Sequence, residues 1–542
     1  MQELELTGNE AIAWAAKCVG VDVATGYPGL PCTSIINTLK NIAEPSATRV
    51  EWSGNERIAL ETAFGVSISG GRSLSVQKMA GLNVALDSLM VMNILGTLGG
   101  MVVAVGDVPG SIFSGNEQDS RCLGAFAELP VLEPGTPQEA FDFTMEAYQI
   151  SEKFGVPVIL RFAKGFALAK GMVSFDCVAP PKKPVTSVIK RSYAPAKARV
   201  DGHAKLHRKL KEIRAYYASS QLNTAEGSGD KAVVTSGFTY VKVKKAMEAK
   251  GLLGACKLIK VGSLNPMPQE FLSQELAGVT QAMAIEEIEP YLEEILRVFA
   301  NTEGQDLKVR GKTSGQVQWE GELSPAHIEL SLDWLMGDQA LGGPDFASVQ
   351  VAEGGNELPG FCDNCPYDFY FSELKKYLAK NQLPRPVFTG EPGCSIYLEA
   401  PPYEMLDAKT SLGGSLGLAC GLSLMQTDRE VVAIVGDSAF FHSEIPTFVY
   451  AAQNGIDVIA MVVYNHAASV TGRQPNPASG FDMKGEKTDI MEIADIVTAC
   501  KASLVKVVKG KDEKAVWEAF DAAFNSKGLR VLILDDLCPL IK

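Results

Sequence analysis

Residues 431–438 run Val-Val-Ala-Ile-Val-Gly-Asp-Ser, an apolar stretch that stops at Gly436, Asp437 and Ser438. A second apolar run, residues 458–463, is followed closely by Asn465. Both runs have the length of strands, and the helical stretch between them favours parallel pairing. Because parallel strands end at one edge of their sheet, we expect Asp437 and Asn465 to present oxygens to one hard cation there, such as Mg²⁺.

The same alternation of strands and helices extends outward from this stretch and predicts an α/β fold of three units with parallel-sheet cores. The predicted strands are 21–25, 74–76, 101–105, 156–162, 232–235, 256–261, 282–286, 431–435, 458–463 and 529–534. The predicted domains are 1–178, 231–303 and 359–542, with a linker carrying a basic helix at 179–230 and a connection at 304–358.

Composition narrows the class of protein. The 542 residues are 46% hydrophobic and 21% charged, which is typical of a folded enzyme. The net charge of −14 disfavours a nucleic-acid-binding body. No apolar run is long enough to cross a membrane, and the acidic start at Met1–Glu5 does not resemble a signal peptide, so we expect a cytoplasmic protein. The 11 cysteines are too few for a disulfide scaffold, and reduced thiols are the simplest expectation.

The spacing of the cation-binding residues resembles a known motif. Twenty-six residues separate Ser438 from Asn465, as in the diphosphate-binding motif of thiamine diphosphate enzymes. The resemblance implies that Asp437, Asn465 and the carbonyl of Ala467 bind Mg²⁺, and that Gly436 and Ser438 lie at the cofactor. Ser438 stands where the motif usually has a second glycine. On its own, Gly-Asp-Ser after a strand is also common turn chemistry.

A second part of a thiamine site is found near residue 56. The stretch 55–65 places Glu56 nine residues before Gly65 on a predicted helix, and Glu61 is the local rival. In thiamine enzymes a glutamate in this place hydrogen-bonds the aminopyrimidine ring. A desolvated carboxyl group beside that ring nitrogen favours the tautomer that activates the cofactor. The alternative is that Glu56 is an ordinary glutamate on a helix surface.

Longer strings resemble the large subunit of indolepyruvate:ferredoxin oxidoreductase, over nearly the whole chain except about 180–230. They are residues 26–31, 115–121, 286–290, 436–443 and 471–475. The resemblance implies a pyrimidine-binding domain, a transketolase C-terminal-like domain and a diphosphate-binding domain, in that order. It also implies a small second subunit of the gamma or beta type, and a homodimer core in which the pyrimidine and diphosphate sites meet.

The same resemblance implies a role for four cysteines. Cys362 and Cys365 form a Cys-x-x-Cys pair, with Cys394 and Cys538 further along the chain. Four thiolates in this order are similar to the ligands of the [4Fe–4S] cluster in 2-oxoacid:ferredoxin oxidoreductases. The alternative is that all four are ordinary thiols. We interpret the remaining seven cysteines as core or surface thiols: Cys18, Cys32, Cys122, Cys177, Cys256, Cys420 and Cys500.

The sequence departs from the family at three places. Leu30 stands where related enzymes have a threonine that helps hold the substrate carboxylate, and a leucine cannot donate a hydrogen bond. The family's Cys-Pro-Gly-Cys reads Cys-Asp-Asn-Cys at 362–365. The sequence ends at Lys542 without the family's C-terminal two-cluster ferredoxin domain, so we expect electrons to leave through another subunit or an electron-transfer protein.

Further side chains complete the predicted site. His442 and His466 flank the metal loops and are expected to contact the cofactor or relay protons, with a structural role as the equal alternative. Gly393 and Gly413 are also predicted to lie at the cofactor. Arg121 is predicted to pair with a substrate carboxylate, with a structural ion pair as the equal alternative.

Together these features predict a thiamine diphosphate-binding subunit that oxidatively decarboxylates a 2-oxoacid to acyl-coenzyme A in an anaerobic setting. The family resemblance implies an arylpyruvate as that 2-oxoacid. The electrons would pass one at a time to the cluster. Two alternatives stay open. One is a non-oxidative thiamine-dependent lyase or carboligase in which the cysteines are not redox active. The other is a scaffold that binds the cofactor without turnover.

Overall fold

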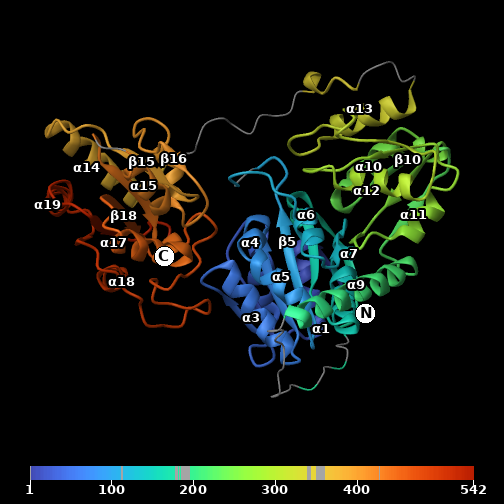
Figure 1. Cartoon of the computed structure of the whole chain (residues 1–542), viewed down its shortest axis with the longest axis horizontal. Helices are drawn as coiled ribbons and strands as arrows, with labels where there is room; N and C mark the ends of the chain where they lie inside the picture. Colours follow the sequence, from blue (N-terminus) through green and yellow to red (C-terminus); the bar gives the residue numbers. More distant parts are fainter. Residues whose placement is uncertain are drawn as a thin grey trace. The chain divides into compact units, whose positions relative to one another are not determined.

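The computed structural model describes residues 2–111, 114–177, 181, 184, 196–337, 343–349, 360–425 and 428–541. Contacts divide the chain into two compact units, residues 1–352 and 353–542 (Figure 1). None of the helices in the described part of the chain is both long and apolar enough to cross a membrane.

The first unit begins with a seven-stranded sheet in the order β12-β6-β7-β5-β4-β2-β3. All neighbouring pairs are parallel except β12 with β6. The strands are β2 Val23–Gly26, β3 Arg49–Trp52, β4 Ser73–Lys78, β5 Met101–Asp107, β6 Val131–Leu132, β7 Val158–Ala163 and β12 Ser263–Asn265. A separate antiparallel pair joins β1 (Gln2–Thr7) to β8 (Lys170–Phe175).

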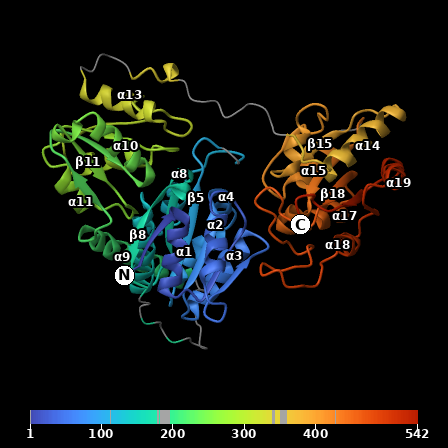
Figure 2. The ribbon, with the colours of Figure 1, turned by 180° about the vertical axis from the view of Figure 1, so that it is seen from behind.

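Helices cover this sheet because each has an apolar side to bury. The helices are α1 Gly8–Val19, α2 Thr33–Ile42, α3 Glu56–Ile68, α4 Met79–Val84, α5 Leu86–Leu95, α6 Ser120–Phe126, α7 Pro137–Phe154 and α8 Lys164–Leu168. Helix α1 packs against α2 and α7, and α3 packs against α5. The turned view in Figure 2 brings α1 and α2 to the front. Helix α9 (Ala196–Ala218) lies across α5, α7 and α11 (Gln269–Glu275).

A five-stranded sheet completes the first unit, in the order β14-β13-β10-β11-β9. Its strands are β9 Thr224–Glu226, β10 Lys231–Thr235, β11 Cys256–Lys260, β13 Gln281–Ala284 and β14 Lys308–Arg310, flanked by α10 Gly237–Ala249 and α12 Tyr291–Thr302. The described parts of the predicted connection, residues 304–337 and 343–349, contain regular structure. They contribute β14 to the sheet and α13 (Pro325–Met336), whose Ile328, Leu332 and Leu335 join the core of this domain.

The second unit is a six-stranded, wholly parallel sheet in the order β16-β15-β17-β18-β20-β19. Its strands are β15 Val387–Gly390, β16 Ala408–Lys409, β17 Val431–Gly436, β18 Val458–Tyr464, β19 Leu504–Lys509 and β20 Leu529–Asp535. Val432 and Ile434 of β17 join one apolar cluster, whereas Val431, Ala433 and Val435 join another. Alternate side chains therefore bury both faces, which explains the continuous apolar run in the sequence.

Helices on each face supply the other half of these two clusters. Helices α14 (Pro366–Lys380) and α19 (Glu513–Phe524) pack on the first cluster. Helices α15 (Ser415–Ser423), α17 (Ile445–Gln453) and α18 (Ile493–Ala499) pack on the second. The predicted α/β class with parallel-sheet cores is confirmed, and the ten predicted strands coincide with observed strands to within one or two residues at most ends. The exact domain boundaries stay a prediction.

Arg121 holds the two sheets of the first unit together. Its guanidinium is 1% exposed and donates to the Asp119 carboxylate at 2.5 Å and to the Glu286 carboxylate at 2.8 Å. It also donates to the carbonyl oxygens of Glu287 and Glu289. The predicted pairing with a substrate carboxylate is therefore replaced by the structural ion pair, because all of these acceptors belong to the protein.

Removing this guanidinium tests its structural role. We expect Arg121→Leu to lower the free energy of unfolding by about 3–5 kcal/mol, because it leaves buried carboxylates without a partner. The measurement is urea unfolding followed by circular dichroism. The control is Arg49→Leu, which removes an exposed pair with Glu51 and is expected to cost less than about 1 kcal/mol. Equal costs for the two variants would contradict the assignment.

Candidate active site

Asp437 and Asn465 lie at the carboxyl edge of the second unit's sheet. Strand β17 ends at Gly436, which is in register with Val463 of β18, so both side chains follow the ends of adjacent parallel strands. Asp437 is 2% exposed and Asn465 is 7% exposed. Asp437 Oδ2 and Asn465 Oδ1 are both buried without a hydrogen-bond partner among the described residues. Two orphaned oxygens at one edge fit the predicted hard-cation site.

The buried environment of Asp437 disfavours its ionised form, which a nearby cation would stabilise. Its Oδ1 accepts a hydrogen bond from the Ser438 backbone N–H at 2.6 Å. Burial raises the pKa of the carboxyl to about 6, against the opposing effects of Asn476, the backbone N–H groups of Ser438 and His466, and the charge of His466. A bound divalent cation adds a large local positive charge and favours the ionised form.

Neighbouring loop residues frame this edge. Asn476, which the sequence analysis did not single out, donates to Ser438 Oγ at 3.0 Å. The carbonyl of Ala467, a predicted Mg²⁺ ligand, lies in the same loop and accepts from Ser469 Oγ. His466 has its Nε2 2.7 Å from Asp535 Oδ1 and its ring stacked on Tyr464. Its observed contacts therefore match the structural alternative for this histidine.

Glu391 organises two of the predicted cofactor glycines. It follows β15 at the same carboxyl edge and is 2% exposed. Its two oxygens accept from the backbone N–H groups of Gly413 and Gly436, each at 2.8 Å. Burial, and after it the charge of Glu444, raises the pKa of this carboxyl well above its usual range. Glu391 directly follows a strand, as Asp437 does, and this position could have marked it in the sequence. Its hydrogen-bond partners Gly413 and Gly436 could not be predicted, because they are distant from it along the chain.

The backbone conformation and the close packing at Gly413 require a glycine. Its backbone has φ of 73°, and a Cβ there would lie 2.7 Å from the Cβ of Ser443. His442, the residue before Ser443, is buried and its Nδ1 lies 2.6 Å from Ser443 Oγ. Gly413 therefore permits the backbone to approach the turn that carries His442.

The four predicted cluster cysteines come together in the second unit. Burial, and after it the charges of Cys365, Cys538 and Cys362, raises the pKa of the Cys394 thiol to about 12. The Cys538 backbone N–H donates to the carbonyl of Asn465 at 3.2 Å, which ties this thiol to the cation edge. Gly393 has φ of 147° immediately before Cys394.

The four thiols are the ligand type that a [4Fe–4S] cluster uses, and in the described part of the chain they do not form a compact single-ion site. Within the described ranges, no three of these sulfurs lie inside 4.8 Å of one another, as ligands of one metal ion would. A [4Fe–4S] cluster binds its four thiolates through different iron atoms, so its ligands stand further apart. The donor set therefore fits the predicted cluster.

Glu56 is a buried residue of the first unit. It is the first residue of α3, is 9% exposed, and follows Asn55, whose side chain caps the helix by accepting from the Ile58 N–H. Gln77 donates to the Glu56 carbonyl, and the charge of Lys78 interacts with Glu56. A Cβ at Gly81 would lie 2.4 Å from Glu56 Cγ, so only glycine leaves room for this carboxyl.

The rival Glu61 has a different environment. It is exposed, pairs with Arg57 at 2.8 Å and accepts from Ser88 Oγ. The hydrogen bond from Arg57, followed by the one from Ser88, lowers the pKa of its carboxyl. A desolvated carboxyl group is what the aminopyrimidine requires, and between these two residues Glu56 alone offers one.

Leu30 lies in the loop after β2 and is 37% exposed. The loop is held by other side chains, since Asn9 donates to the Pro31 carbonyl and Thr33 Oγ1 accepts from the Gly29 N–H. The apolar side chain of Leu30 therefore projects from an ordered loop and cannot donate a hydrogen bond to a substrate.

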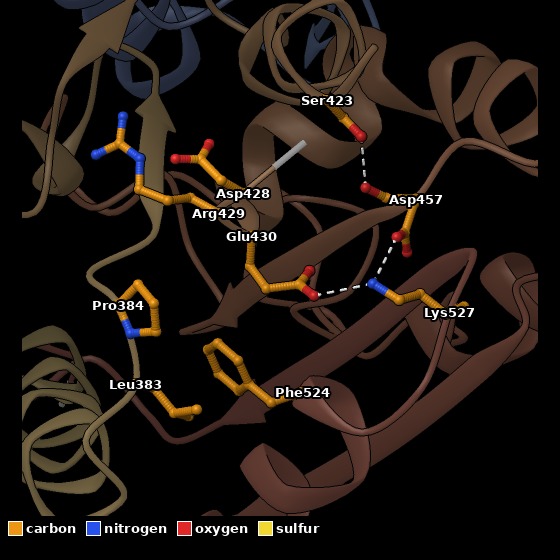
Figure 3. A pocket seen from close by; sticks show the side chains of 9 residues that line it. All are labelled: Leu383, Pro384, Ser423, Asp428, Arg429, Glu430, Asp457, Phe524 and Lys527. Atoms are coloured by element: carbon orange, nitrogen blue, oxygen red, sulfur yellow. Dashed lines mark hydrogen bonds and ion pairs between the residues drawn. The ribbon is translucent and has the colours of Figure 1, made fainter. Parts of the chain in front are cut away.

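A pocket in the second unit lies away from this chemistry (Figure 3). It is lined by Leu383, Pro384, Ser423, Asp428, Arg429, Glu430, Asp457, Phe524 and Lys527. Glu430 and Asp457 immediately precede β17 and β18, so the pocket is at the amino ends of the strands, opposite the Asp437 edge. Both carboxylates already pair with Lys527 and with the buried Arg530. It is therefore not the candidate active site.

One prediction about the cysteines was wrong. Cys18 and Cys177 were expected to be separate thiols, but the structure joins them in a disulfide with their Cα atoms 4.6 Å apart. The bond links α1 to the residues after β8, 159 positions along the chain. Such a pairing cannot be deduced from spacing alone. Cys32, Cys122, Cys256, Cys420 and Cys500 are free.

Comparison with known proteins places the chain in a family. Residues 394–534 match the family described as thiamine pyrophosphate enzyme, C-terminal TPP binding domain. Residues 14–218 match pyruvate flavodoxin/ferredoxin oxidoreductase, thiamine diP-bdg. The chain is 30% identical over 556 residues to indolepyruvate oxidoreductase subunit IorA of Archaeoglobus fulgidus, covering 100% of this chain and 87% of that protein. The chain belongs to the IorA family.

Other relatives agree with this assignment. The IorA subunit of Methanothermobacter thermautotrophicus is 32% identical over 548 residues, with 99% of this chain and 87% of that protein covered. The fold is similar to a 2-oxoglutarate:ferredoxin oxidoreductase from Magnetococcus marinus, with a TM-score of 0.50, 15% identity, and coverage of 61% of this chain and 65% of that one.

Family membership and the two thiamine diphosphate-binding regions make the chain a subunit of a thiamine diphosphate-dependent 2-oxoacid oxidoreductase. The oxidoreductase relatives favour this function over the lyase or carboligase alternative.

Proposed function

We propose that the chain binds thiamine diphosphate through a Mg²⁺ ion held by Asp437, Asn465 and the Ala467 carbonyl, and that it oxidatively decarboxylates an arylpyruvate-type 2-oxoacid. The observation that carries the proposal is the pair of buried, unpartnered oxygens, Asp437 Oδ2 and Asn465 Oδ1, at the carboxyl edge of β17 and β18. Oxygen ligands of this kind hold Mg²⁺ together with substrate or cofactor phosphates.

The surrounding residues position the diphosphate end. Gly436, Gly413 and Gly393 leave the backbone accessible, and Glu391 fixes the first two through their N–H groups. Ser438 and Asn476 hold each other at 3.0 Å beside Asp437. His442 belongs to the helical segment Phe440–Glu444 after β17, and His466 belongs to the loop after β18. Their proposed task is to orient these segments, with His466 acting through its pair with Asp535.

Glu56 is proposed as the catalytic carboxyl group at the aminopyrimidine ring. The bound cofactor supplies a carbon nucleophile and an electron sink for decarboxylation. Glu56 holds a proton at the ring nitrogen, which requires a carboxyl group shielded from water. Its burial, its place at the start of α3 and the absent side chain at Gly81 support this role.

The four thiols Cys362, Cys365, Cys394 and Cys538 are proposed to hold a [4Fe–4S] cluster that accepts the electrons of the reaction. Their mutual electrostatic interaction and the bond from Cys538 to Asn465 support a site beside the cation edge. Without a metal, burial keeps the pKa of Cys365 and Cys394 raised, so these thiols are protonated at neutral pH. Ligation to iron would deprotonate them.

The aromatic substrate is proposed from the IorA relatives, whose names specify indolepyruvate. The exposed, apolar Leu30 at the loop after β2 supports a substrate with an apolar side chain rather than a grip on the carboxylate. Coenzyme A is the proposed acyl acceptor, as the family resemblance implies.

The chain is proposed to work in a complex. The relatives are named as subunits, so we propose a small second oxidoreductase subunit and an electron-transfer protein or subunit as partners, around a homodimer core. The proposed location is the cytoplasm of an anaerobic cell, which the proposed [4Fe–4S] cluster supports.

Calorimetry of cofactor binding tests the Mg²⁺ site. We expect Asp437→Asn and Asn465→Ala to weaken Mg²⁺-dependent binding of thiamine diphosphate by about 100-fold or more, since a lost charged contact in a buried site costs a few kcal/mol. The matched control is Asp489→Asn, which removes the same charge at an exposed position. Unchanged affinity in the Asp437 variant would contradict the proposal, as would cofactor binding to the wild type that persists undiminished in EDTA.

A glycine substitution tests the placement of Glu56 without altering the carboxyl group itself. We expect Gly81→Ala to displace Glu56 and to lower kcat for 2-oxoacid oxidation at least tenfold, as Glu56→Gln would. The control is Gly65→Ala on α3, where a Cβ would meet nothing within 4 Å. The measurement is steady-state oxidation with an artificial one-electron acceptor. Full activity in the Gly81 variant would show that the position of Glu56 is not required.

Iron and sulfide analysis of anaerobically purified chain separates the oxidative function from the lyase alternative. We expect about four iron and four sulfide per chain in the wild type. Cys362→Ser and Cys394→Ser should lower this content, whereas Cys500→Ser, which alters a free thiol outside the four, should not. A wild-type chain free of iron that still decarboxylates a 2-oxoacid would favour the lyase.

A further inference from the structure

A cluster of two imidazoles and a carboxylate lies in the first unit, among side chains that the proposed reaction does not use. His203 Nε2 is 2.5 Å from Glu128 Oε2, and His207 Nε2 is 2.8 Å from Glu128 Oε1. The two histidines are one helical turn apart on α9, so their rings face the same side, with centroids 4.3 Å apart. Their three ligand atoms all lie within 4.8 Å of one another.

We infer that Glu128, His203 and His207 bind a divalent first-row transition-metal ion, with Zn²⁺ as the representative ion. Zinc binds imidazole nitrogen and carboxylate oxygen at about 2.0–2.2 Å, which places the ligand atoms of a tetrahedral site about 3.3 Å apart. A small outward movement of the observed side chains reaches this spacing. Imidazole ligands favour zinc, copper, nickel and cobalt over the Mg²⁺ of the oxygen-only site.

The exposure of the three side chains defines the kind of site. Glu128 is 29% exposed, and His203 and His207 are 46% and 52% exposed. Three protein ligands on one side leave the remaining coordination positions to water. The site can therefore load and lose its metal in the folded protein, unlike a closed four-ligand structural site.

The end of α6 sets the position of Glu128. Glu128 follows α6 with φ of 53°, in the left-handed region, and the Leu129 N–H closes this helix end by donating to the Gly124 carbonyl at 3.1 Å. Here the conformation directs the carboxylate at the two imidazoles of α9.

The metal would clamp the first half of α9 to the turn after α6. The helix has few buried residues: Gly202, Leu206, Ile213 and Tyr217. Its second half is further held by Lys209, Arg214 and Tyr216, which bond to Gly155, Gln269 and Glu146 respectively. A metal bridge at His203 and His207 would add a further link in the first half of the helix.

Zinc uptake by the full-length, anaerobically purified chain tests this site. After EDTA treatment and dialysis into metal-free buffer, we expect the wild type to take up one more equivalent of Zn²⁺ than His203→Ala/His207→Ala. Glu128→Gln should weaken the affinity for that equivalent at least tenfold, whereas Lys205→Ala, an exposed control on the same helix, should not. Since all three side chains are partly exposed, the variants are expected to keep the wild-type Tm without metal.

Two further measurements distinguish this site from the thiols. Amide hydrogen exchange over residues 196–210 should slow with Zn²⁺ in the wild type and not in the double variant. With Co²⁺ as the probe, the wild-type minus variant difference spectrum should lack the intense thiolate-to-cobalt band that cysteine ligation produces. Equal Zn²⁺ uptake by the wild type and the double variant would overturn the inference, leaving a carboxylate hydrogen-bonded to two imidazoles. The result is independent of the thiamine and iron sites.

Discussion

The parallel pairing of β17 with β18 is the constraint on which the site depends. It brings Asp437 and Asn465, 28 positions apart, to the same buried edge of the sheet. A buried polar atom without a hydrogen bond costs folding free energy, and this edge carries two, Asp437 Oδ2 and Asn465 Oδ1. A cation coordinated by these two oxygens would give them the partner that they lack, and the folding free energy lost there would be offset by the free energy of cation binding. Under the proposed function, this locally unfavourable arrangement would become favourable when a cation binds.

The same edge organises the groups around it. Glu391, just after β15, fixes the backbone of Gly413, before α15, and of Gly436, at the end of β17, so two strand ends and one helix start share a network. Cys538, just after β20, reaches the network through the Asn465 carbonyl. Electron acceptance and cofactor binding, if both occur as proposed, would thus be built on adjacent strand ends. One rigid sheet would then position both sets of ligands.

Much of this architecture could be predicted from local sequence. Buried strands appear as apolar runs, and Asp437, Asn465 and Glu56 stand directly at the ends or starts of regular elements. Contacts between distant residues could not be predicted. The partners of Arg121 are 165 positions away or more, apart from Asp119, and the Cys18–Cys177 disulfide spans 159. The Glu128 cluster was missed for the same reason, since its carboxylate and its histidines belong to separate elements.

Buried charges in this chain fall into two groups with different consequences. Arg121, Arg161 and Arg530 are buried among carboxylates that pair with them, so they stabilise the fold. Asp437, Glu391 and Glu444 form no ion pair with any described residue, and burial raises the pKa of all three. These three acids gather at one edge of one sheet, and the charge of Glu444 further raises the pKa of Glu391. A buried, unpaired carboxyl group either stays protonated, with a raised pKa, or ionises when a positive charge joins it. The proposed cation would therefore complete the electrostatics of this edge, whereas Arg121, Arg161 and Arg530 are already paired with carboxylates.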